Sequence, residues 1–197
     1  MKKLILIIAV IAITTSSLAQ TKYGLKLGVN LANGSGEGFK DTDNRIAPAF
    51  GGFVRVPMAE RLVFQPEVIY SPQGSKETAV EEGINIDVTT TFDYLNFPLM
   101  LKYYLDKGLN FQFGPQVGYL ISSKVKMEFL GRKVDVDVKD QFKNLDFGIN
   151  FGVGYDLDMG LGFDLRYNLG LTDIVDSNEI DTDGKHGVVQ FTAGYAF

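Results

Sequence analysis

The chain contains no cysteine and no tryptophan, and His186 is its single histidine. The lack of cysteine excludes disulfides, thiol catalysis, cysteine-ligated metals and the lipidated cysteine of a lipoprotein. Long apolar runs are also missing after the first 19 residues, so no later segment is a candidate for a membrane helix, which needs about 20 apolar residues. Acidic residues outnumber basic ones by 24 to 19, which argues against nucleic acid as a partner.

The first residues have the three regions of a secretory signal peptide. A charged start, Met1-Lys2-Lys3, is followed by an apolar stretch over residues 4–13 that is too short to span a membrane. Ser17-Leu18-Ala19 fits the small-x-small rule for cleavage. The sequence therefore predicts a signal peptide over residues 1–19 and one domain over residues 20–197.

The remainder of the chain repeatedly alternates apolar with polar or small residues, which is the period of a β-strand with two different faces. The segments have about 9 to 12 residues, the length of tilted membrane strands and more than the usual length of about 5 to 6 in globular proteins. The eight segments are approximately 23–31, 47–56, 62–70, 95–103, 109–119, 145–155, 161–169 and 188–197.

The connections between these segments alternate strictly in length. Short ones lie near residues 57–60, 106–108 and 156–160, and long ones at 32–46, 72–90, 122–144 and 172–187. Eight antiparallel strands with both termini in the periplasm need three short turns there and four longer loops outside. We therefore predict an all-β fold, an eight-stranded antiparallel up-and-down transmembrane β-barrel in the outer membrane of a Gram-negative bacterium.

The charged residues decide which face of each strand meets lipid. A Lys or Arg at the bilayer midplane of a barrel costs about 2 to 4 kcal/mol, and a one-residue slip would expose each whole polar set. The polar faces must therefore line the lumen, which an eight-stranded barrel fills with side chains and leaves without an open pore. The predicted lumen polar cluster comprises Lys26, Arg55, Glu67, Lys102, Gln116, Asp146, Asp164 and Arg166.

Two features fit this pattern less well. Pro66, Pro98 and Pro115 lie inside predicted strands, where each removes a ladder hydrogen bond. We expect bulges or early strand ends at these prolines. Phe53 falls on the predicted lumen face, among polar residues.

The last strand ends the sequence on an aromatic residue. Phe191, Tyr195 and Phe197 occupy alternate apolar positions, and this ending resembles the C-terminal sorting signal of outer-membrane barrels. Further segments, namely residues 23–30, 64–71, 95–103 and 113–118, resemble the PorT-type "porin family" outer-membrane β-barrel domain, with the size of an OmpA-like or OmpX-like barrel.

The resemblance implies a location more than a role. Most members of that family have no assigned activity, and one founding member is associated with a secretion apparatus. The expected partners are outer-membrane lipid, the barrel-assembly machinery and a protein bound at the extracellular loops. Alternation within residues 125–138 suggests that one hairpin continues above the membrane as a ribbon, whose edge is available to a partner.

Other functions remain open from the sequence. His186 with Ser177 and Asp176 would be the candidates for a lipid-modifying enzyme, but a solvated loop histidine is the favoured interpretation. Residues 179–184 partly match a calcium loop, yet the twelfth position is Gln190 and not Glu. We predict no enzyme, cofactor or metal, and a structural or surface-interaction role, with a narrow solute channel or a soluble lipocalin-like binder as further alternatives.

Overall fold

The computed structural model describes residues 21–35, 43–81, 84–106, 108–129, 132–173 and 185–197. The signal peptide predicted for residues 1–19 lies outside them. Among the described residues, no helix has the length and apolarity needed to cross a membrane. The elements are β1 (Lys22–Ser35), β2 (Asp43–Ala59), β3 (Leu62–Glu81), β4 (Ile84–Asp106), β5 (Leu109–Phe129), β6 (Arg132–Asp137), the 3-10 helix η3 (Lys139–Gln141), β7 (Leu145–Asp156), β8 (Leu161–Gly170) and β9 (Lys185–Ala196).

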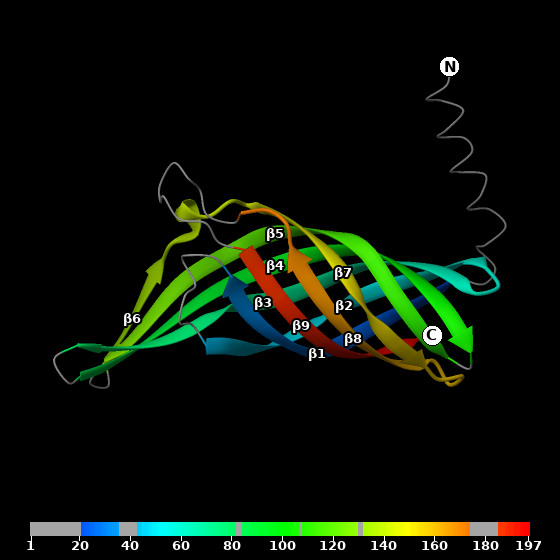
Figure 1. The fold of residues 1–197 in the computed structure, drawn as a ribbon, viewed down its shortest axis with the longest axis horizontal. Helices are drawn as coiled ribbons and strands as arrows, with labels where there is room; N and C mark the ends of the chain where they lie inside the picture. The colour runs from blue at the N-terminus through cyan, green and yellow to red at the C-terminus, as the bar shows by residue number, and fades with distance from the viewer. Residues whose placement is uncertain (1–20, 36–42, 82–83, 107, 130–131, 174–184) are drawn as a thin grey trace, which may run out of the picture.

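Eight of the strands form a closed antiparallel ring in the order β1-β2-β3-β4-β5-β7-β8-β9 (Figure 1). The ring closes where β1 pairs with β9, along a ladder that runs from Gly24 opposite Ala196 to Ser35 opposite Lys185. β6 lies outside the ring and pairs with the far end of β5. The predicted eight-stranded barrel is therefore confirmed, with one additional short strand.

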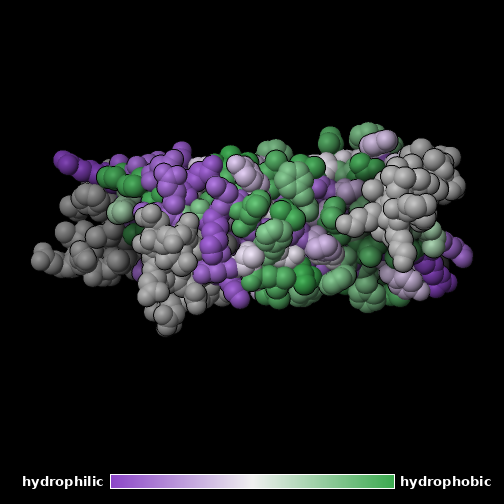
Figure 2. All heavy atoms as spheres, turned by 90° about the horizontal axis from the view of Figure 1, so that it is seen from above, coloured by the Kyte–Doolittle hydropathy of each residue, from purple (hydrophilic) through white to green (hydrophobic). Residues whose placement is uncertain are grey.

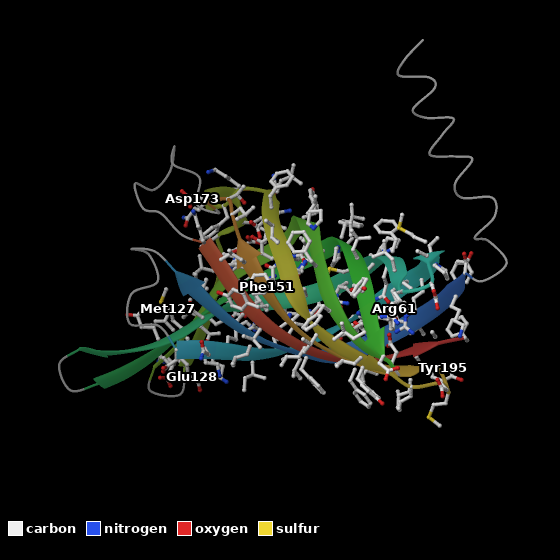
Figure 3. The ribbon with its side chains drawn as sticks, turned by 45° about the vertical axis from the view of Figure 1, so that its right-hand side comes forward. Arg61, Met127, Glu128, Phe151, Asp173 and Tyr195 are labelled. Atoms are coloured by element: carbon white, nitrogen blue, oxygen red, sulfur yellow. The ribbon has the colours of Figure 1, made fainter. Side chains whose placement is uncertain are left out.

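The two faces of the ring have opposite chemistry. Leu27 is 69% exposed on the outside, whereas the adjacent Lys26 is 3% exposed because it points into the lumen. The outward apolar residues form a belt around the barrel, and Figure 2 shows hydrophobic side chains gathered over the middle of the molecule with hydrophilic ones toward its ends. Phe151, labelled in Figure 3, is one of these exposed side chains. Since lipid is the solvent of an outer-membrane barrel, this belt has the orientation that the sequence predicts.

Three short turns join β2 to β3, β4 to β5 and β7 to β8 at the same end of the ring. Two of them need glycine, since Gly108 and Gly160 have φ angles of 96° and 91°. Short turns are periplasmic in outer-membrane barrels. The opposite end of the ring is therefore extracellular, and the connections from β1 to β2 and from β8 to β9 at that end are longer.

The structure corrects the predicted loop over residues 72–90. β3 continues to Glu81 and β4 begins at Ile84, and the two pair regularly from Pro72 opposite Asp93 to Glu81 opposite Ile84. These residues therefore extend the sheet beyond the membrane. The expected ribbon over residues 125–138 is present as the end of β5 paired with β6.

The expectation of bulges or early strand ends at Pro66, Pro98 and Pro115 is wrong, because β3, β4 and β5 continue past them. Register shifts lie elsewhere in the described ladders, and Pro115 pairs in register with Ile149. On one side each of the three prolines lies in a short gap in pairing, but the same register resumes after each gap. Because β3, β4 and β5 are long and paired on both sides, the loss of single hydrogen bonds does not shift them.

Candidate functional site

A buried ion cluster occupies the lumen near the periplasmic end of the ring. Lys26 Nζ on β1 lies 2.9 Å from Glu67 Oε1 and 3.0 Å from Asp164 Oδ2, and Lys102 Nζ on β4 lies 3.0 Å from Asp164 Oδ1. Arg166 on β8 donates from Nη1 to Glu67 Oε2 and from Nη2 to Glu67 Oε1, each at 2.8 Å. Strands from around the ring are thus joined across the lumen.

Asp156, at the end of β7, extends the ion cluster. Its Oδ1 accepts a hydrogen bond of 2.6 Å from Arg55 Nη2, and its Oδ2 lies 3.5 Å from Lys102 Nζ and accepts a hydrogen bond from the Tyr104 hydroxyl. Arg55 Nε also donates to Gln65 Oε1 at 2.9 Å. We define the ion cluster as Lys26, Arg55, Glu67, Lys102, Asp156, Asp164 and Arg166.

Of the eight residues predicted to line the lumen, the structure therefore brings six together. Asp146 and Gln116 also point inward and are buried, but they lie at other levels. Asp146 accepts a hydrogen bond of 2.7 Å from Thr172 Oγ1, and Gln116 Oε1 accepts one of 3.1 Å from Asn150 Nδ2. The third acid of the cluster is thus Asp156 and not Asp146.

Asp156, Gln65, Gln112 and Tyr104 are not among the residues predicted for the lumen cluster, although they contact it in the structure. Gln112 ties the cluster together, because its Nε2 donates to Asp164 Oδ1 while its Oε1 accepts a hydrogen bond of 2.8 Å from Arg166 Nε. A signal for Asp156 was present. It continues the inward, even-numbered series of its strand, although its position beside a short connection suggested a turn.

Phe53 fits among these charges because its ring interacts with two of them. Lys26 Nζ lies 5.4 Å and Arg55 Cζ lies 5.0 Å from the centroid of the Phe53 ring. Cations over an aromatic face are favourable at such distances. Phe53 therefore completes the packing of the ion cluster.

A layer of uncharged polar side chains lies above the ion cluster. Asn30 Nδ2 donates to Ser71 Oγ at 2.8 Å, and Asn30 Oδ1 accepts from Gln190 Nε2 at 2.9 Å. Asn168 Nδ2 donates to Asn150 Oδ1 at 3.3 Å. These hydrogen bonds across the lumen match several polar groups that are removed from water, whereas Asn168 Oδ1 has no hydrogen-bond partner among the described residues.

A mainly aromatic cluster covers the extracellular end of the lumen. We define this aromatic cluster as Phe92, Tyr94, Phe142 and His186 together with the aliphatic Leu120. The imidazole of His186 is edge-on to the rings of Phe92 and Tyr94, with centroids 5.1 and 5.4 Å apart, and Phe142 contacts Phe92 at 4.7 Å. The prediction of a solvated loop histidine is therefore wrong, because His186 is 2% exposed and belongs to β9. Ser177 and Asp176 lie outside the described residues.

The position of His186 fixes its charge state. It pairs with Gly34, beyond Leu31 and Val189 of the outward apolar belt, and so lies outside the membrane-spanning part of β9. Burial in the aromatic cluster lowers the pKa of His186 from 6.5 to about 4. The imidazole is therefore neutral at physiological pH.

Beyond the belt, four strands continue as a protruding sheet, which we define as residues 75–81 of β3, 84–91 of β4, 123–129 of β5 and all of β6. Figure 3 places Met127 and Glu128 of this sheet at the end of the molecule opposite Arg61 and Tyr195. β6 forms one edge and is exposed along its whole length.

The protruding sheet reverses the chemistry of the barrel faces. In β5 a register shift falls where Tyr94 pairs with Leu120 and Asp93 with Ser122, so Ile121 is an extra residue. After it Ser123 points inward and Lys124 outward. Because of this shift, the row of valines and methionine follows the lumen side and the charges follow the outside. The apolar row comprises Val88, Val125, Met127, Val134 and Val136, and the charged face comprises Asp87, Lys124, Lys126, Glu128, Lys133, Asp135 and Asp137.

The C-terminal aromatic residues lie on the outer face of β9 and just beyond its end. Phe191, Tyr195 and Phe197 are all exposed there, and the Phe197 amide donates to the Tyr23 carbonyl at 2.9 Å. The end of the chain is thus held in the sheet beside the start of β1. Its aromatic face is directed at the lipid.

Comparisons with known proteins agree with this architecture. The crystal structure of Ail, the attachment invasion locus protein of Yersinia pestis, superposes with a TM-score of 0.51 at 15% sequence identity, covering 89% of this chain and 98% of that chain. Neisserial surface protein A gives a TM-score of 0.51 at 9% identity, covering 89% and 97%. No curated protein sequence matches this chain significantly. The model of the outer membrane protein beta-barrel domain matches residues 18–176, so the chain belongs to the outer membrane protein β-barrel domain family.

Proposed function

We propose that this protein is a non-enzymatic surface-interaction protein of the outer membrane, closed to solutes and active through its protruding sheet. The observation that carries the proposal is the reversal of faces at the register shift beside Ile121. A barrel that served only as a wall would need no ordered, amphipathic sheet beyond the membrane. Here the sheet continues the ring outward and ends on an exposed strand.

The filled lumen argues against transport. A solute would have to displace Lys26, Glu67 and Arg166, whose side chains are almost completely buried and bonded to one another. Separating such charges leaves each buried without its partner, which costs several kcal/mol. Above them the aromatic cluster would also have to open.

A conductance measurement tests the closed lumen. We expect the refolded protein in a planar bilayer to show no steady single-channel openings, with a known open porin as the positive control. Steady openings on the nanosiemens scale would contradict the proposal. The narrow channel would then become the function to pursue.

A second experiment tests the protruding sheet. Replacement of residues 125–136 by a two-residue turn removes nearly all of β6 and the tip of β5 with its pairs to residues 87–90 of β4. It leaves the pairs of β5 up to Lys124 with β4 and all of its pairs with β7. We expect cells carrying this variant to insert as much barrel as the wild type and to lose adherence to protein-coated surfaces. Unchanged adherence would contradict a role for the sheet.

The name of Ail describes attachment and invasion by that protein, and it supports a surface role only by similarity of fold. Within this proposal, the PorT-type resemblance suggests a more specific role as an accessory protein of a secretion or envelope assembly. We assign no catalytic role to His186, because its imidazole is enclosed by Phe92 and Tyr94.

The C-terminal sorting signal forms part of the same proposal. Phe191, Tyr195 and Phe197 would be read by the barrel-assembly machinery before β9 closes against β1. Replacing Phe197 with Ala is expected to lower the amount of inserted barrel in cells while leaving refolding in detergent unchanged. Equal insertion of both chains would remove the signal from the proposal.

A further inference from the structure

β6 has a backbone edge that is ready to pair. The Val138 amide donates to the Ser123 carbonyl at 3.1 Å, so Val138 and Ser123 form a hydrogen-bonded pair of the β5–β6 ladder. Alternation along an antiparallel strand then directs the backbone groups of Val134 and Val136 toward β5. Those of Lys133, Asp135 and Asp137 point to the other edge, where the described part of the chain contains no paired strand.

The charges of β6 do not protect this edge against its own sequence. Edge strands usually avoid association through charges that repel an added strand. Here Lys133 and Asp135 have opposite signs and lie two residues apart on the same face. Across β5 and β6 each charge already faces its opposite, with Lys126 opposite Asp135 and Glu128 opposite Lys133, so the face tolerates strands of alternating charge.

One register suits two copies of β6. When the strands are antiparallel and centred on Val134, Lys133 of each copy lies opposite Asp135 of the other, and the two Val134 side chains meet on the apolar face. These Lys–Asp positions are also the ones whose backbone groups point to the free edge. If one strand slides by two residues along the other, Asp135 comes to lie opposite Asp135, or Lys133 opposite Lys133. Like charges directly opposite each other are destabilising.

We infer that the partner of the protruding sheet is a second copy of this chain in an opposing membrane, and this inference rests on the proposed surface role. A two-fold axis perpendicular to the sheet relates antiparallel strands. Because β5 runs without a break from the barrel into the protruding sheet, the sheet extends along the barrel (Figure 1). The two-fold axis therefore turns the second barrel to point in the opposite direction. The rotation keeps the apolar faces of both sheets on the same side.

Opposing membranes also compensate for the shortness of the contact. β6 has six residues, and a pairing of this length is weak between two free molecules. Two membranes that each carry many copies form many such contacts at once, which raises the avidity far above the affinity of one pair. The inference is therefore homotypic adhesion between membranes, and not a dimer within one membrane.

Vesicle clustering tests this inference. The protein is inserted into two populations of phosphatidylcholine vesicles with different fluorescent lipids, and its orientation is checked by protease cleavage at the protruding sheet. Co-clustering is measured by fluorescence cross-correlation. We expect wild-type vesicles to co-cluster. For K133D or D135K vesicles we expect the cross-correlation signal to fall at least tenfold, toward the level of protein-free vesicles.

A charge swap identifies the register. In a mixture of K133D vesicles with D135K vesicles, every cross-strand pair is again Lys opposite Asp, so clustering should return. Restoration on mixing also shows that neither variant lost its hairpin. Asp135→Pro removes one amide at the free edge without touching the ladder to β5 and should abolish clustering. Asp158→Lys, in the periplasmic turn, is the control with the same charge change as D135K.

Three results would overturn the inference: wild-type vesicles that do not cluster, single variants that cluster like the wild type, or no restoration on mixing. In the first of these cases, energy transfer between copies within one vesicle would show that the pairing takes place within one membrane. None of these outcomes affects the conductance and adherence tests, so the proposed surface role would stand with a different partner.

Discussion

Arg166 and Glu67 form a bidentate ion pair across the lumen, in which both nitrogen-to-oxygen distances are 2.8 Å and both side chains are almost fully buried. Glu67 accepts in addition from Lys26 Nζ at 2.9 Å and from Gln65 Nε2 at 2.6 Å. One carboxylate thus holds together residues from β1, β3 and β8. Its loss should affect the ring as a whole.

We therefore expect Glu67→Ala to destabilise the barrel by about 3 to 5 kcal/mol, because Arg166 and Lys26 remain buried after losing a partner. Urea unfolding of the protein in lipid vesicles measures the change. Glu60→Ala, in an exposed periplasmic turn, is the control and should leave the unfolding midpoint unchanged. A midpoint for Glu67→Ala equal to that of the wild type would show that the ion cluster contributes no net stability.

Gly154 of β7 gives room to the ion cluster, because it pairs directly with Asp164 of β8. A Cβ at this position would overlap the Gln112 amide, and it would lie 2.6 Å from Asp164 Oδ1 and 2.8 Å from Asn110 Oδ1. Gly154→Ala should therefore cost about 1 to 3 kcal/mol through overpacking. Gly52→Ala is the matched control, since its Cβ would meet nothing closer than 3.6 Å. Equal unfolding midpoints for the two variants would contradict this packing.

Much of the ring follows from alternation alone. Each predicted segment coincides with an observed strand, apart from Phe197 just beyond the end of β9, because a lipid-facing side chain at every second position leaves a strong pattern. The extensions of β3 and β4 were missed for the same reason. Beyond Asp93 the outward positions become polar, as at Thr91 and Thr89, so the pattern reverses and resembles a loop.

The partners within the lumen could not be predicted. The alternation of inward and outward side chains along each strand predicts which residues point into the lumen. Which of these residues contact one another depends on how far the strands are displaced along one another. Lys26 reaches both Glu67 and Asp164, which are far apart in the chain. The burial of His186 depends in the same way on Phe92 and Tyr94, which come from β4 on the other side of the ring. Nothing near His186 in the sequence signals them.

The protruding sheet should be energetically separate from the barrel. Lys133 Nζ and Glu128 Oε2 are 3.1 Å apart across β5 and β6, but both side chains are largely exposed, and exposed pairs contribute less than about 1 kcal/mol. We expect Lys133→Ala to leave the urea midpoint of the barrel unchanged. A clear shift of that midpoint would show that the sheet and the ring unfold as one unit.

His186 should report the state of the aromatic cluster as the pH falls. Since burial lowers its pKa to about 4, the imidazole is neutral in both the folded and the unfolded chain above pH 6.5. Between pH 6.5 and 4 the unfolded chain binds a proton that the folded chain does not, so folding stability decreases as the pH decreases. Because His186 is the single histidine, its C2 proton gives an isolated NMR signal, which should titrate near pH 4 when folded and near 6.5 in urea. His186→Phe keeps an aromatic ring at this position and should remove that part of the pH dependence. A folded midpoint near 6.5 would show that water reaches the imidazole.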